Sequence, residues 1–144
     1  MAILESIREY DGHRDGVIST LNRARPHLNH GYTDAWPELE LLRHELSQRM
    51  QAFQVFKHRE LFDPLIRGHG GQGVIGLQLK TDCIKLGADY SDFQRRWLKA
   101  EVEARWPEYR LSAIVMMTTI RTAIADQDGI VRRLEILVDN SRFQ

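Results

Sequence analysis

The chain of 144 residues carries twenty basic and twenty acidic side chains, and 42% of its residues are hydrophobic. This length and composition predict one globular domain over residues 1–144, and the balanced charge gives no general attraction to nucleic acid or to an anionic membrane. A single cysteine excludes an internal disulfide, and the N-terminus lacks the pattern of a signal peptide. No apolar run approaches the ~20 residues that span a bilayer. We therefore expect a soluble, cytoplasmic protein.

The first predicted helix covers residues 2–24. Its apolar residues follow a heptad-like stripe that Arg14 alone interrupts: Ile3, Ile7, Tyr10, Val17 and Leu21. A break at Asp11-Gly12 is an alternative, because glycine costs a helix ~1 kcal/mol relative to alanine. Arg25-Pro26 ends this helix, and residues 26–36 form a loop rich in turn formers.

The second predicted helix is the longest and covers residues 37–67. Its stripe has the spacing of a helix with one buried face: Leu39, Leu42, Leu46, Met50, Phe53 and Phe56. Pro37 takes the first helical position, where its missing N–H costs nothing, and Thr33 or Asp34 caps the helix. Beyond His58 the apolar residues occur on more than one side, so we expect this end to be more deeply buried.

Five glycines lie between Gly68 and Gly76, and three of them match the pattern G-x-G-x-x-G of dinucleotide-binding loops. That fingerprint requires a strand before the glycines, whereas here a helix precedes them. The segment therefore predicts a turn between two helices.

The third predicted helix covers residues 74–88 and stops at Gly87. Ser91 caps a fourth segment, and Pro107 either kinks it or begins a new helix. The helical pattern continues to about Ala125, residues 126–129 are a weak point, and residues 130–138 form a short amphipathic end. Every periodic segment has the helical period, so we predict an all-α fold, an up-down antiparallel four-helix bundle. A short fifth helix at the C-terminus is an alternative for the last segment.

The C-terminal segment has one apolar face, which includes Leu134 and Leu137. This face either closes the bundle or pairs with a second chain, and a symmetric dimer is the commonest way to bury such a face. We therefore expect a homodimer in which these two leucines lie at the interface.

Four stretches of the chain resemble hemerythrin-like, HHE-type cation-binding domains, which are four-helix bundles with a di-iron site. The stretches are HRDGVISTL from His13, ELFDPLI from Glu60, LKTDCIKL from Leu79 and FQRRWLKAE from Phe93. The resemblance implies a bundle with ligand positions on all four helices, and it places His13 at the first of them.

The remaining positions depart from the family pattern. The resemblance assigns Gln54 and His58 to the pair on the second helix, Cys83 with Asp82 to the third, and Glu101 and Arg105 to the pair on the fourth. A protonated arginine has no lone pair to give a metal, so we expect the di-iron site to be vacant and no cofactor to be bound. The alternative is a reduced site for one iron or zinc on His13, His58 and a carboxylate, Glu101 or Asp82.

Each candidate residue also has a purely structural interpretation. His13 is then a half-exposed helix residue, His58 a histidine at the edge of the core and Cys83 an inert, buried small residue. If the family register holds, Gln54, His58, Glu101 and Arg105 form a polar network without metal. Glu101 would then raise the pKa of His58 above ~6.5.

The predicted function is that of a hemerythrin-like binding or regulatory module, not an enzyme, which binds another protein or a small ligand through its surface or an internal pocket. The alternative from another class is a metalloprotein that senses or stores oxygen or metal at the reduced site. A third, weaker reading is an enzyme with its substrate at the glycine-rich segment.

Overall fold

The computed structural model describes residues 3–68 and 73–141, and its elements are all helical. In chain order they are α1 (Ile3–Ala24), the 3-10 helix η1 (Arg25–Asn29), α2 (Tyr32–Lys57), the π-helix η2 (His58–Phe62), α3 (Asp63–Arg67), α4 (Gly73–Arg96), α5 (Lys99–Ala104) and α6 (Trp106–Ser141). No strand occurs in these two ranges, so the prediction of an all-α fold is confirmed. None of the described helices is long and apolar enough to cross a membrane.

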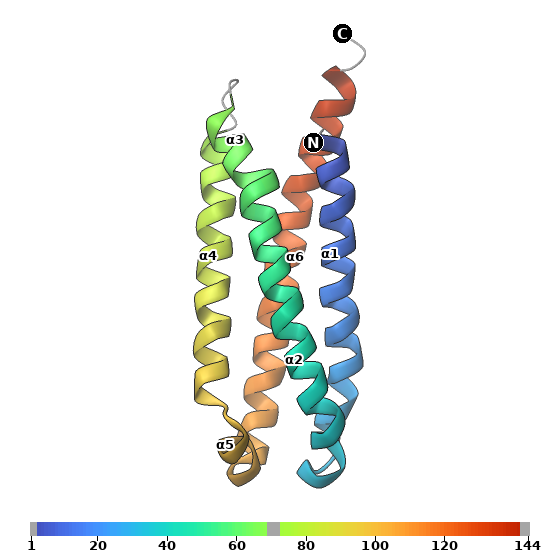
Figure 1. Cartoon of the computed structure of the whole chain (residues 1–144), viewed down its shortest axis with the longest axis vertical. Coiled ribbons are helices and arrows are strands. Elements are labelled where there is room, and N and C mark those ends of the chain that lie inside the picture. The colour runs from blue at the N-terminus through green and yellow to red at the C-terminus, as the bar shows by residue number, and fades with distance from the viewer. Residues whose placement is uncertain (1–2, 69–72, 142–144) are drawn as a thin grey trace.

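Four long helices, α1, α2, α4 and α6, lie along the long axis of the molecule (Figure 1). Helix α1 packs against α2 and α6, and α4 packs against α6 and α2. Helix α3 lies at one end and α5 at the other, and α1 begins and α6 ends on the side of α3.

Helix α1 agrees with the prediction over the residues described, and it continues through Asp11-Gly12 without a break. Its stripe residues Tyr10, Val17 and Leu21 are fully buried. Burial of this face outweighs the cost of the glycine, because most helical stability in proteins comes from packing rather than from propensity.

Helix α2 begins at Tyr32, five residues before the predicted start. Gly31 is its N-cap, and no side chain caps it, so capping by Thr33 or Asp34 is wrong. The reason lies in the core: Trp36 is buried and stacks on Tyr32 with the ring centroids 5.6 Å apart, which favours a helical turn ahead of the proline. The predicted loop over residues 26–36 is therefore mostly helical.

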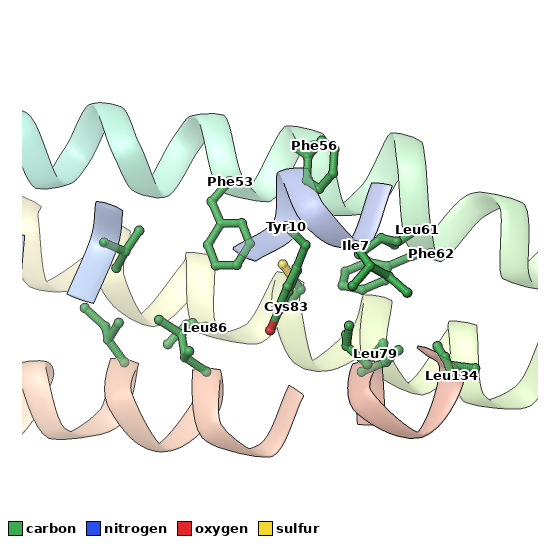
Figure 2. Close-up of a cluster of buried hydrophobic side chains, with 14 of the residues drawn as sticks. Ile7, Tyr10, Phe53, Phe56, Leu61, Phe62, Leu79, Cys83, Leu86 and Leu134 are labelled. Carbon is green, nitrogen blue, oxygen red and sulfur yellow. The ribbon is translucent and has the colours of Figure 1, made fainter. Parts of the chain in front are cut away.

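The predicted helix over residues 37–67 ends in two further helical segments, η2 and α3. In η2 the Asp63 N–H donates to the carbonyl of His58, five residues back, so one residue more than in an α-helix is accommodated. This residue changes which positions face inward. Phe53 of α2 and Phe62 of η2 both belong to the same core cluster (Figure 2), which accounts for apolar residues on more than one side of this segment.

Helix α4 runs through Gly87 to Arg96, so the predicted stop at Gly87 and the cap at Ser91 are wrong. A Cβ atom at Gly87 would lie 2.8 Å from the side-chain amide nitrogen of Gln54. Gly87 thus allows α2 and α4 to approach each other, a role that depends on a neighbouring helix and not on local conformation.

Helix α6 begins at Trp106, with Pro107 as its second residue. Of the two predicted alternatives, a kink at Pro107 or a new helix, the new helix is therefore confirmed. It then continues through residues 126–129, so the separate fifth helix is wrong. Leu134 is 6% exposed and packs in the core of its own chain (Figure 2), so it is not free to form a dimer contact. The side chains of Leu137 and Val138 lie outside the described residues.

The core consists of two clusters. The first fills the half of the molecule near α3 and combines side chains of α1, α2, η2, α4 and α6, among them Tyr10, Phe53, Phe62, Leu79 and Ile120. The second lies toward α5 and is aromatic: Trp36, Trp97, Trp106 and Tyr109.

Three helical glycines give a test of this packing. Nothing lies within 4 Å of a Cβ atom placed at Gly12 or Gly129, so each change to alanine is expected to raise the free energy of unfolding by ~1 kcal/mol. At Gly76 a Cβ atom would lie 2.8 Å from Leu65 Cβ and 3.1 Å from the Phe62 carbonyl oxygen. Gly76→Ala is therefore expected to lower the free energy of unfolding by ~1–2 kcal/mol, because backbone and Cβ atoms cannot move aside without displacing a helix. Urea unfolding of the three variants checks the signs, and a stabilising Gly76→Ala would contradict the close contact of α4 with η2 and α3.

Candidate functional site

The ligand positions taken from the family resemblance do not come together. Glu101 lies on the short helix α5 and Arg105 directly after its end, and both are exposed. The Arg105 guanidinium is bonded to Glu108 and lies 3.9 Å from Glu101. Neither is bonded to His58 or Gln54, so the predicted network of these four residues is wrong. The register counted from Phe93 fails because the chain leaves α4 at Arg96 and begins a new helix at Lys99.

His58 lies at the start of η2, with its Nε2 atom buried and without a hydrogen-bond partner among the described residues. Its ring meets that of Phe62 edge-on, with the centroids 5.3 Å apart. Burial and the nearby Lys80 ammonium lower the pKa of His58 below its ordinary value, although Asp63 acts in the opposite direction. The expected rise in the pKa of His58 is therefore wrong, because Glu101 lies on α5 and not beside His58, and desolvation outweighs the effect of Asp63.

The other candidate positions lie on three helices: His13 on α1, Gln54 on α2, and Asp82 and Cys83 on α4. His13 is half-buried on α1 and lies against the rings of Phe53 and Phe56, at centroid distances of 5.9 and 4.9 Å. Asp82 is exposed and accepts a hydrogen bond from Gln78, whereas Cys83 beside it is buried. Within residues 3–68 and 73–141, no three His, Cys, Asp or Glu side chains lie close enough together to hold a metal ion.

A buried lysine, Lys57, lies at the end of α2. It is 3% exposed, and its ammonium group donates to Gln127 Oε1 of α6 at 2.9 Å. The Nζ atom also lies 4.0 Å from the ring centroid of Phe53. Burial lowers the pKa of Lys57, because removing an ammonium from water disfavours its charged form.

Lys57 and Cys83 line one small cavity, of about 20 Å³, together with Met50, Phe53, Gln54, Leu86 and Ile124. This volume suits one water molecule and excludes any substrate. Burial raises the pKa of the Cys83 thiol, and the ammonium of Lys57 lowers it in part. Both shifts favour the uncharged forms. We name Lys57, Cys83 and Gln127 the buried polar layer.

Charged side chains flank this layer on the side of α1. The Arg14 guanidinium is paired with Asp128 of α6 at 2.5 Å, and Arg132 of α6 is paired with Asp11. Next to these charges Tyr10 is fully buried, and burial and Asp128 raise the pKa of its hydroxyl. Two reciprocal ion pairs therefore join α1 to α6 at this level.

The sequence analysis missed Lys57 and Gln127, although a signal for both exists. Lys57 follows Phe53 by four residues and so continues the apolar stripe of α2, and Gln127 lies on the stripe of α6 between Ile124 and Val131. Polar residues at core positions of two helices indicate that they meet inside the bundle. This signal requires no knowledge of any family.

A groove opens on the other side of Gln127, between α4 and α6. Its volume is about 470 Å³, and its lining includes four largely apolar positions, Leu79, Leu86, Ala123 and Ile130. Toward α5 it continues into a second hollow of about 340 Å³, since Asp89 and Thr119 line both. We name the two hollows together the α4–α6 groove.

The rim of the α4–α6 groove is acidic. The second hollow is lined by Arg96 and by Asp92, which is paired with Arg95. The larger hollow is lined by Lys85 and by three carboxylates, those of Asp82 and Asp89 of α4 and of Asp126 of α6. All three carboxylates are exposed, and none forms an ion pair with a described basic side chain. Gln127 lies at the bottom of the groove, 4% exposed, and its Nε2 atom has no hydrogen-bond partner in the described part of the chain.

Comparison with known proteins gives no identification: no family model matches the chain, and no curated protein or solved structure matches it significantly. The resemblance to hemerythrin-like domains therefore stays a prediction from the sequence.

Proposed function

We propose that the protein is a binding module whose ligand site is the α4–α6 groove, carried by an up-down antiparallel four-helix bundle. The course of the chain in Figure 1 and the contacts of α1 with α2 and α6, and of α4 with α6 and α2, support the bundle arrangement. In such a bundle the groove between two neighbouring helices is a rigid surface.

The groove is the observation that carries this proposal. Neighbouring helices usually close the space between them with long apolar side chains. Here α6 presents short side chains instead, Thr118, Thr119, Thr122 and Ala123, which leave a hollow between the helices. Ala123 and Ile130 are partly exposed in it, above the buried Leu79 and Leu86. Concave apolar surfaces with a polar rim are typical of binding sites.

The buried polar layer supports this reading in a structural role. Its cavity of about 20 Å³ admits no substrate, and the Lys57–Gln127 hydrogen bond joins α2 to α6 directly beneath the groove. Such a bond fixes the relative position of two helices. Lys57 therefore holds the wall of the site in place.

The alternative of a reduced iron or zinc site has less support from the geometry. It requires Glu101 or Asp82 beside His13 and His58, whereas Glu101 lies on α5 and Asp82 on the exposed rim of the groove. In the proposed binding module, by contrast, Asp82 belongs to the rim of the ligand site and needs no change of position. A homodimer formed through the groove is a further arrangement that light scattering would reveal.

Nuclear magnetic resonance tests the proposed function. The labelled protein is titrated with a panel of amphipathic helical peptides of either charge and with small apolar compounds. We expect at least one member to shift the amide signals of residues 79–89 and 119–130. Thr122→Trp, which fills the groove, should abolish these shifts, whereas Thr33→Trp at the exposed start of α2 should not.

If no member of the panel shifts these signals, or if Thr122→Trp leaves the shifts unchanged, the groove is not the ligand site and the proposed function is wrong.

A further inference from the structure

We propose that the natural occupant of the α4–α6 groove is a basic amphipathic helix of a partner protein. This inference rests on the proposed function, because it names the ligand of the same site. Three properties of the groove carry it: its length, the height of its walls and the charge of its rim.

The length of the groove fits a helix. Along α6 its lining runs from Ser112 to Ile130, which are 18 residue steps apart. At 1.5 Å per residue the groove is ~27 Å long, or about five helical turns. A small molecule would occupy one of the two hollows, whereas a helix of similar length would occupy both.

The walls of the groove are low on the side of α6. Thr118, Thr119, Thr122 and Ala123 are small, and the Thr119 hydroxyl is already bonded to the carbonyl of Val115 one turn earlier. Small side chains allow a third helix to approach closely enough for its apolar residues to reach Ala123 and Ile130, which are partly exposed above the buried Leu79 and Leu86. Val115, which is 65% exposed at the edge of the second hollow, extends the apolar contact toward α5.

The rim selects the charge of the occupant. Asp82 and Asp89 are seven residues apart on α4, so they lie on one side of the groove ~10 Å from each other, and Asp126 lies on the α6 side. A helix with lysine or arginine beside its apolar stripe would pair with all three. An acidic helix or an anionic membrane surface would be repelled, since complementary charge at a rim governs association and excludes wrong partners.

The test uses three synthetic peptides of 18 residues. The first has a leucine and alanine face flanked by lysine and arginine, the second has glutamate in place of each basic residue, and the third has the composition of the first in an order without an apolar face. Fluorescence anisotropy measures their affinity for the full chain. We expect the first peptide to bind more than tenfold tighter than the other two, and its affinity to fall as the salt concentration rises.

Two charge-reversed proteins locate the effect. In the variant Asp82→Lys, Asp89→Lys, Asp126→Lys the affinity for the basic peptide should fall by tenfold or more, and the affinity for the acidic peptide should rise. The control variant Glu38→Lys, Glu40→Lys, Glu103→Lys changes the net charge equally at exposed positions outside the groove and should leave both affinities within about twofold. Circular dichroism of both variants confirms that they are folded.

The outcomes separate this inference from the proposed function. If the acidic peptide or a small apolar compound binds the groove and the basic peptide does not, the partner named here is wrong and the binding module stands. If the control variant loses the basic peptide as strongly as the rim variant, net charge and not the groove attracts it, and the inference fails. If no probe binds the groove, both proposals fail.

Discussion

Replacing Gln127 by leucine is expected to lower the free energy of unfolding by about 2–4 kcal/mol, although leucine is the more apolar residue. The substitution removes the hydrogen-bond acceptor of Lys57, which is 3% exposed and is bonded to no carboxylate of the described residues. A buried ammonium without an acceptor must either lose its proton or draw water into the core, and both are costly. Gln48→Leu, at an exposed position of α2, is the matched control and should have little effect.

The second arm of this experiment is the double variant Lys57→Met, Gln127→Leu. Both polar groups are then replaced by apolar side chains of similar size, so the double variant is expected to be at least as stable as the unchanged protein. Urea unfolding of the single and double variants gives the coupling between the two sites. If the losses of the two single variants simply add, Lys57 and Gln127 do not interact and the buried polar layer is wrongly described.

The buried lysine also has a pH signature. Because burial lowers the pKa of Lys57 in the folded protein, the unfolded chain binds more protons between that value and ~10.4. The free energy of unfolding should therefore rise with pH in this window. Below the window Lys57 is charged in both states, and the full cost of burying its charge destabilises the folded protein. Cys83 and Tyr109, whose pKa values burial raises, that of Tyr109 to about 12, act in the opposite direction, Cys83 above about pH 9 and Tyr109 above about pH 10. The comparison with Lys57→Met should therefore be made below pH 9, where the variant should lose the rise.

Replacing Trp97 by alanine is expected to lower the free energy of unfolding by about 3–5 kcal/mol. Trp97 is 1% exposed, its Nε1 donates to Ser112 Oγ at 3.0 Å, and its ring meets that of Tyr109 edge-on with the centroids 5.5 Å apart. Its carbonyl accepts a hydrogen bond from Arg43 of α2 at 2.6 Å. The residue thus joins three helices at the point where α4 ends.

Trp97→Phe separates the ring from the hydrogen bond. It keeps an aromatic ring against Tyr109 and loses the donor to Ser112, so a smaller loss of about 1–2 kcal/mol is expected. Thermal unfolding followed by circular dichroism measures both variants. If Trp97→Ala costs less than 1 kcal/mol, the aromatic cluster near α5 does not stabilise the fold as described.

Sequence periodicity predicted the fold correctly where the residues of one helix alone determine which of its faces is buried. The stripe of α1 with Tyr10, Val17 and Leu21 is buried as expected, and the all-helical class follows from the same period. Prediction failed where the conformation of a residue depends on its contact with a second helix. Gly87 was interpreted as a helix stop because its contact with Gln54 of α2 is invisible in the local sequence.

The candidate site could be predicted only in part for the same reason. Lys57 and Gln127 each occupy a core position of their own helix, which the sequence shows, but that they bond to each other depends on how α2 and α6 are aligned. The groove is still less accessible to prediction, because it results from short side chains on α6 facing acidic ones on α4. Family resemblance misplaced Glu101 and Arg105 because it assumed one continuous helix where the chain turns between α4 and α5.

The π-helix η2 shows that this protein holds one more residue than an unbroken α-helix would need between α2 and α3. Deleting one residue between His58 and Phe62 would restore ordinary α-helical hydrogen bonding. Because the π turn holds its extra residue within a single turn, the residues after the deletion would keep their orientation about the helix axis. Leu65 would stay in the core and in contact with Gly76 of α4. A natural relative that lacks this residue should therefore have the same apolar residues, each one number earlier. An alignment of such a relative must place a gap of one residue inside a continuous helix.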